Sequence, residues 1–145
     1  MADIAEELKT YLKSISAVTD LVGAGTAARI YTHRAKQGVT LPYIVFQVYE
    51  GQSYEHLTGI TGVAMNRVEV NCYAATSSAA YTLAEAVRLA PLQMFRGTMN
   101  STFVHNVTSD GGYERDFDPP DRGGNQRRYF VSRDYLITYE EPTTA

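Results

Sequence analysis

The sequence predicts a single α+β domain over residues 1–145, with two helices packed on one face of a mostly antiparallel sheet. Helical and strand-like periodicities alternate in the order helix, strands, helix, strands. The connections between strand-like segments are too short for crossover helices, which favours antiparallel pairing. No repeat, low-complexity segment or linker divides the chain.

Residues 3–15 are predicted to form an amphipathic helix. Asp3 stands at the N-cap position and Glu6 follows three residues later, as in a capping box. The apolar positions recur at helical spacing, and the charged ones are expected to face water; they are Ile4, Leu8, Leu12 and Ile15, against Glu6, Glu7, Lys9 and Lys13. A second short turn is expected over 17–22, ending at the glycines that follow.

Three strands should follow. Residues 29–32 are a short strand, and 41–51 are the strongest strand in the chain, rich in β-branched and aromatic residues. Because 41–51 is apolar on both faces, it is either central in the sheet or covered by a partner chain. Residues 52–62 are expected to be a polar connection. Residues 64–73 alternate, with Val68, Val70 and Cys72 on one face.

A second helix is predicted over 77–90, capped by Thr76 or Ser77, with Pro91 kinking or ending it. Its apolar stripe is Ala80, Leu83, Val87 and Ala90. Strands are then expected at 101–108, 112–117 and 128–139. In the last of these, one face carries Tyr129, Val131, Tyr135, Ile137 and Tyr139.

Composition excludes several functional classes. A net charge of −3 argues against a surface built to grip nucleic acid, which needs clustered Lys and Arg. Cys72 is the only cysteine, so neither an internal disulfide nor a Cys-rich zinc site can form. The N-terminus has no signal-peptide pattern and no run of about 18 apolar residues exists, so a cytoplasmic protein is expected.

The candidate catalytic motifs are weak. Residues 23–28 match GxGxxA, but they follow a helix and precede a strand, whereas a dinucleotide site needs the reverse; a helix C-cap is favoured. His33, His56 and His105 make no metal-binding pair. Cys72 shares an apolar face, which favours a buried thiol over a nucleophile. No catalytic residue, metal or cofactor is therefore expected.

The segment 117–128, FDPPDRGGNQRR, interrupts two strand-like flanks. The prolines stiffen its entry and the glycines permit a turn, so it is predicted to be the tip of a hairpin between 112–117 and 127–139. Acids and arginines balance, which favours a protein contact over an ion cage or a DNA contact. The residues expected to bind a neighbouring subunit or a tail or connector protein are Asp116, Asp118, Asp121, Arg122, Arg127 and Arg128. The alternative is a disordered solvent loop.

Eleven tyrosines and no tryptophan are a further signal. Tyrosine combines apolar area with a polar tip, which suits protein interfaces. The alternative is that many of them are half-buried sheet residues.

Several stretches, taken in order, resemble the phage tail completion or tail terminator family of long-tailed phages and gene transfer agents. They are 29–32 RIYT after a valine-glycine turn, 41–51 LPYIVFQVYEG, 67–74 RVEVNCYA with the helix 77–90, and 130–139 FVSRDYLITY. The resemblance implies a virion neck protein, assembled in the host cytoplasm, that forms a ring, usually hexameric, on the tail tube.

Such a ring would stop tube polymerisation and dock the head connector. Its partners would be further copies of itself, the tail tube protein and a head–tail connector or stopper, with DNA passing through without specific binding. The resemblance brings no catalytic motif. Two alternatives stay open: another connector or stopper of the neck, and a small enzyme or nucleic-acid module.

Overall fold

The computed structural model describes residues 4–35, 38–56, 59–92, 95–109, 116–118 and 128–140. Within these ranges, residues 50–61, 90, 91 and 116–118 are described by their backbone only. No helix in these ranges is long and apolar enough to span a membrane.

The described strands form one curled sheet in the order β1-β2-β3-β7-β5-β4, with β6 also paired to β7. Their bounds are β1 Ile30–Thr32, β2 Tyr43–His56, β3 Gly59–Ala74, β4 Gly97–Met99, β5 Thr102–Ser109, β6 Asp116–Asp118 and β7 Arg128–Glu140. The pairing is antiparallel except between β1 and β2, which run parallel. The predicted fold class is therefore confirmed.

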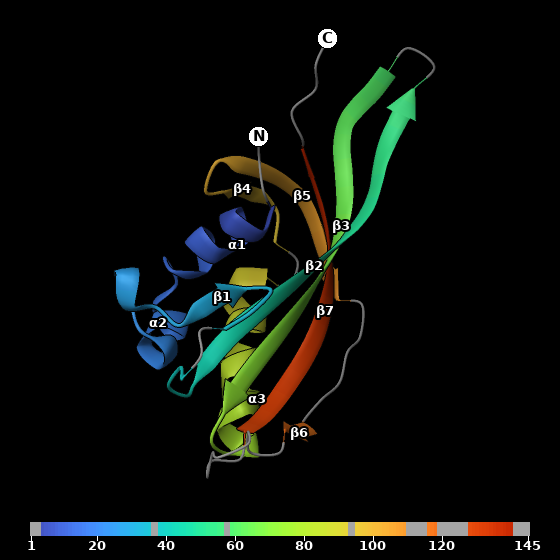
Figure 1. The fold of residues 1–145 in the computed structure, drawn as a ribbon. Helices are drawn as coiled ribbons and strands as arrows, with labels where there is room; N and C mark the ends of the chain where they lie inside the picture. Colours follow the sequence, from blue (N-terminus) through green and yellow to red (C-terminus); the bar gives the residue numbers. More distant parts are fainter. Residues whose placement is uncertain are drawn as a thin grey trace.

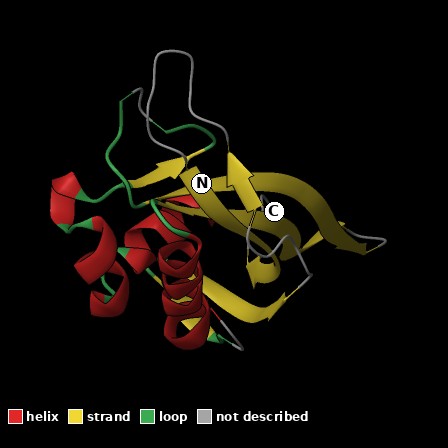
Figure 2. Cartoon of the chain, turned by 90° about the horizontal axis from the view of Figure 1, so that it is seen from below, coloured by secondary structure: helices red, strands yellow, loops and turns green. Residues whose placement is uncertain are grey.

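The helices cover one face of this sheet (Figures 1 and 2). They are α1 Ile4–Leu12, α2 Ser16–Val22 and α3 Ser77–Val87, with a short 3-10 turn at Gly25–Ala27. The helix predicted over 3–15 ends earlier, and the short turn expected after it is the full helix α2. Thr76 caps α3, since its hydroxyl accepts a hydrogen bond from the amide of Ala79 at 3.1 Å.

The core lies between the helices and the sheet. Its largest contributors come from every layer, and they include Leu8, Leu12, Val18, Val22, Ile44, Phe46, Val68, Val70, Leu83, Val87, Val131, Tyr135 and Ile137. The alternation predicted for 64–73 holds, because Val68, Val70 and Cys72 are all buried here. In the predicted stripe of the second helix, Ala80, Leu83 and Val87 are buried as well.

Three local predictions were wrong. The polar connection expected at 52–62 is instead the paired ends of β2 and β3, because polar residues also form strands where no core imposes alternation. The α-helix predicted over 77–90 ends at Val87 instead, and the chain continues through Pro91 as a π-helical turn, Arg88–Leu92. A wider turn tolerates a residue that lacks an amide hydrogen.

The third wrong prediction concerns Glu7, which was expected to face water but is only 8% exposed. Its carboxylate accepts hydrogen bonds from the amide of Ser101 at 3.0 Å and from the Ser101 hydroxyl at 2.5 Å. Although burial acts in the opposite direction, these bonds hold the pKa of Glu7 below its ordinary value. The pair joins α1 to the turn between β4 and β5.

Candidate assembly interface

The segment predicted to contact a partner begins and ends on described strands. β6 and the start of β7 pair antiparallel, with Asp116 opposite Phe130 and Asp118 opposite Arg128. The described parts of the flanks thus pair as the sequence predicted, and residues 112–115 of the expected strand 112–117 lie outside the described residues. Asp121, Arg122 and Arg127 also lie outside them.

Arg128 is held by aromatic neighbours at the base of this segment. Its guanidinium donates to the hydroxyl of Tyr43 at 3.1 Å and lies 5.9 Å from the ring centre of Tyr73. Tyr43 and Tyr73 stack at 4.8 Å, and Tyr73 meets Phe130 at 5.4 Å. The arginine therefore ties β7 to β3 and β2 on the face without helices, which fixes where the segment leaves the sheet.

The same face carries an ion pair near the middle of the sheet. Arg67 donates from Nε at 3.2 Å and from a terminal nitrogen at 2.6 Å to one carboxylate oxygen of Asp134. Arg67 also lies 6.0 Å from the ring of Tyr49, which is 49% exposed. Tyr49 and Leu89 are the large exposed hydrophobic residues of the described chain.

The described tyrosines divide between core and surface. Tyr43, Tyr135 and Tyr139 are buried, so part of the tyrosine excess is structural, as the alternative reading held. Burial raises the pKa of Tyr135 to about 12. Tyr49 is the tyrosine that presents the most surface to a partner.

The motifs tested for catalysis serve structural roles. Burial raises the pKa of Cys72 to about 12, so its reactive thiolate is suppressed. Gly23 follows α2 with a φ of 92° and donates to the carbonyl of Thr19, which makes the GxGxxA match a helix C-cap. His33 lies 3.3 Å from the side-chain oxygen of Gln47, and His105 lies 3.4 Å from Glu140. Among the described residues, no three His, Cys, Asp or Glu side chains are arranged to hold a metal.

One cluster of charged residues joins α3 to β7, with Arg133 buried and Glu85 and Arg88 partly exposed. Glu85 accepts from Arg133 and from Arg88, both at 2.7 Å, and Arg133 also lies 5.4 Å from the ring of Tyr81. The hydrogen bonds from Arg88 and Arg133 lower the pKa of Glu85 to about 2. This carboxylate is charged and doubly paired, so it locks α3 to β7 and is poorly suited to act as a general base.

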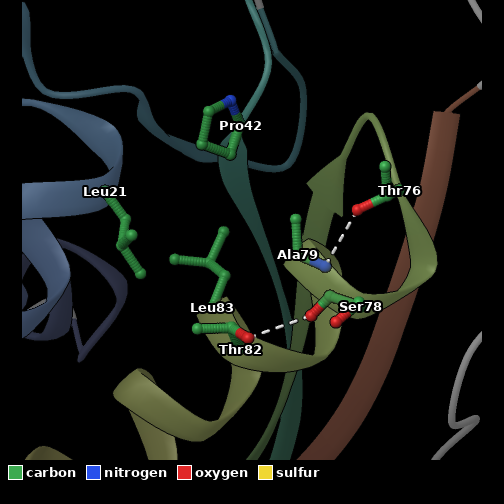
Figure 3. Close-up of a pocket in the computed structure, with 7 residues that line it drawn as sticks. All are labelled: Leu21, Pro42, Thr76, Ser78, Ala79, Thr82 and Leu83. Carbon is green, nitrogen blue, oxygen red and sulfur yellow. Dashed lines mark hydrogen bonds between the residues drawn. The ribbon is translucent and has the colours of Figure 1, made fainter.

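A pocket of about 340 Å³ lies between the end of α2, the start of β2 and the first turns of α3 (Figure 3). Its seven lining residues carry no titratable group; they are Leu21, Pro42, Thr76, Ser78, Ala79, Thr82 and Leu83. Two lining hydroxyls already bond within α3, Thr76 with the amide of Ala79 and Thr82 with the carbonyl of Ser78. The pocket therefore supplies shape and hydroxyl groups, but no titratable side chain that could act as an acid or a base.

Sequence reasoning missed the most prominent surface feature, the ribbon formed by the distal parts of β2 and β3. It pairs as far as Glu55 with Ile60 and His56 with Gly59, and it extends past the rest of the sheet (Figure 1). The signal available was the polar but β-compatible sequence QSYEH before the glycine of the returning strand.

Comparisons with known proteins identify a family and a shared fold. The sequence profile of the family described as "Tail completion protein gp17" matches residues 6–92, which is more than half of the chain. A search of curated proteins finds no match. A chain in a solved structure entitled "Virion of native gene transfer agent (GTA) particle" shares the fold, with a TM-score of 0.63 over 94% of each chain at 12% sequence identity.

Proposed function

The chain belongs to the tail completion protein gp17 family, and from this premise we propose that it is a tail terminator. In this role it forms a ring, of six subunits, on the end of a phage or phage-like tail tube. The ring stops tube polymerisation and provides the docking face for the head connector. The protein is then a component of the virion neck, assembled in the host cytoplasm.

The family match is the observation that carries the proposal. It spans most of α1, then α2, β1, β2, β3, α3 and the turn Arg88–Leu92, so it includes the helices and about half of the sheet. The fold shared with a chain of a gene transfer agent virion agrees with it. The chemistry of the described residues also fits a structural role, since their charged groups pair with one another instead of converging on a cavity.

In this role the partners are further copies of the chain, the tail tube protein and a connector or stopper. We extend the proposal to the segment 117–128 and the residue before it, of which Asp116, Asp118, Asp121, Arg122, Arg127 and Arg128 contact one of them. Carboxylates and arginines on one short segment offer both charges to a protein surface. A net charge of −3 fits a channel through which DNA passes without sticking.

The test is removal of the gene from cells that produce the particle. A terminator predicts tubes of uncontrolled length and heads without tails, and electron microscopy of complemented particles should place the chain as a ring between tube and connector. Tubes of normal length that still fail to join heads would instead identify a stopper or connector. Complete, functional particles without the chain would refute a neck role.

A further inference from the structure

Beyond the pair Ser53 and Ala64, the ribbon formed by residues 50–62, here called the arm, has no third strand within the described residues. The pairing of β3 with β7 ends at Val63 opposite Glu140, whereas β2 and β3 continue to pair to Gly59. On its other side, β2 pairs with β1 only from Ile44 to Phe46. The arm therefore presents the outer edge of β2 over its whole length (Figure 1).

Such a ribbon is expected to be marginally stable when it stands alone in water, because a two-stranded hairpin buries little apolar surface. Register irregularities between Tyr49 and Gln52, and between Ser53 and Glu55, bend it away from the sheet. Its unpaired amides and carbonyls are a template for another strand. A third strand would therefore stabilise the arm, and the outer edge of β2 is where such a strand can bind.

A second open edge lies at the opposite side of the same sheet. β4 pairs with β5 only from Thr102 to Val104, so residues 105–109 of β5 have no described strand on that side. Asn106, Thr108 and Ser109 are exposed there. In Figure 1, the β4–β5 edge and the arm lie toward the same end of the molecule, on opposite sides of it.

The charges of the two edges are complementary. Residues 50–62 contain Glu50 and Glu55 and no lysine or arginine. Residues 93–109 contain Arg96 and no acidic residue, and Arg96 is exposed beside the start of β4. The acids that contact this region from other elements are Glu140, which lies 3.4 Å from His105, and Glu7, which is bonded to Ser101 in the turn between β4 and β5. Contact between unlike edges is therefore favoured over contact between two copies of the same edge.

We propose that the arm of one copy of this chain adds its β2 edge to the open β5 edge of the next copy. The inference rests on the proposed ring and names the contact that builds it. The two edges belong to opposite sides of one sheet. Each copy can therefore bind one neighbour through its arm and the other neighbour through its β5 edge. Head-to-tail contacts of this kind can close into rings. Main-chain pairing supplies the affinity, as in strand addition generally.

Cross-linking between two single-cysteine variants tests this geometry. Gln52→Cys places a thiol on the arm and Thr108→Cys places one on the β5 edge; Cys72 is buried and does not compete. A mixture of the two, treated with a short bismaleimide, should give a covalent dimer that neither variant gives alone. Leu89→Cys is the matched control, because Leu89 is 61% exposed and lies on the helical turn after α3, on neither of the two edges.

Truncation of the arm is the second test. Residues 54–63 are replaced by Asn-Gly, which closes a two-residue hairpin across the pair Ser53 and Ala64 and keeps every core residue. This variant should melt like the wild type, yet lose ring formation in solution and on tail ends.

The outcomes separate this contact from the proposed function. If wild-type rings form and the truncated chain forms them equally well, or the mixed cysteine variants fail to cross-link, the arm contact is wrong and the terminator role stands. If wild-type protein forms no ring on tail ends, the terminator role fails and the arm contact fails with it.

Discussion

Two buried positions with different electrostatic surroundings provide a test of the core. Val70 and Leu83 are 2% and 1% exposed, so Val70→Asp and Leu83→Asp each introduce a carboxyl group into the same apolar cluster. Val70, however, lies directly opposite Arg133 in the pairing of β3 with β7. A carboxylate at position 70 therefore has a cation at cross-strand distance, whereas Leu83 is surrounded by apolar and hydroxyl groups.

The expected costs follow from the protonation of each new carboxyl group. A fully buried, unpaired carboxyl raises its pKa by about 3 units or more, and each unit corresponds to about 1.4 kcal/mol. Leu83→Asp should therefore cost about 4 kcal/mol at pH 7 from ionisation alone, in addition to the lost packing. For Val70→Asp, an ion pair at 4 Å with an effective dielectric constant of 20 returns up to about 4 kcal/mol. Because Arg133 already pairs with Glu85 at 2.7 Å, we expect the new carboxylate to gain about half of that ion-pair stabilisation.

Urea unfolding of both variants between pH 4 and pH 7 distinguishes these cases. In Leu83→Asp the folded state binds its proton more tightly than the unfolded state, so the destabilisation relative to wild type should grow as the pH rises. In Val70→Asp, Arg133 favours the charged carboxylate, so the destabilisation should increase much less as the pH rises. Leu83→Ala is the control, with a cost of about 2–5 kcal/mol and no such pH dependence. Equal costs and equal pH trends for the two aspartates would refute the placement of Arg133, and wild-type melting of both would refute the core.

Three further predictions concern single contacts and the segment after β6. Glu7→Gln should cost about 1–3 kcal/mol at pH 7, because a charged acceptor for Ser101 is lost. Since the pKa of Glu7 is lowered in the folded state, the difference from wild type in urea unfolding should shrink as the pH falls below the ordinary 4.5, and a constant difference would contradict the pairing. Thr76→Ala should cost about 1 kcal/mol in thermal unfolding through loss of the cap on Ala79, while Thr76→Ser should be nearly neutral; equal losses would argue against the cap. Replacing residues 119–126 with a short Gly-Ser turn should leave the melting temperature unchanged but abolish head joining, and full particle yield would show that the segment is only a solvated loop.

The parts of the fold that were predictable are those where burial imposes a period. Val68 and Val70 alternate on β3 because one face meets the helices, and Leu83 falls in a helical stripe because α3 meets the sheet. The distal parts of β2 and β3 do not show such a period. No helix covers them, so polar residues occupy both faces and the sequence resembles a loop.

Buried charge was the other source of error, because it depends on partners far away in the sequence. Glu7 was assigned to the solvent face of its helix, but its hydrogen-bond donor is Ser101, 94 residues later. Arg133 lies within a strand that was predicted correctly, yet its burial follows only from Glu85 on α3. Of the predicted partner-binding residues, Arg128 is the one whose side chain is described, and its contacts with Tyr43 and Tyr73 join strands that no local pattern brings together.

The positions of these features separate stability from assembly. The ion pair of Glu85 with Arg133 fixes α3 to β7, and the core cluster lies between the helices and the sheet. Residues 54–56 and 59–62 of the arm lie past the last pairing of β3 with β7. Substitutions there should therefore alter association without altering the free energy of unfolding, because packing and charge burial dominate the latter. Substitutions at Glu85 or Arg133 should do the reverse, since loss of either leaves a buried charge without its partner. If substitutions in the arm and at the Glu85–Arg133 pair each changed association and the free energy of unfolding together, assembly and folding would be coupled in this chain. The arm could then not be treated as an independent docking element.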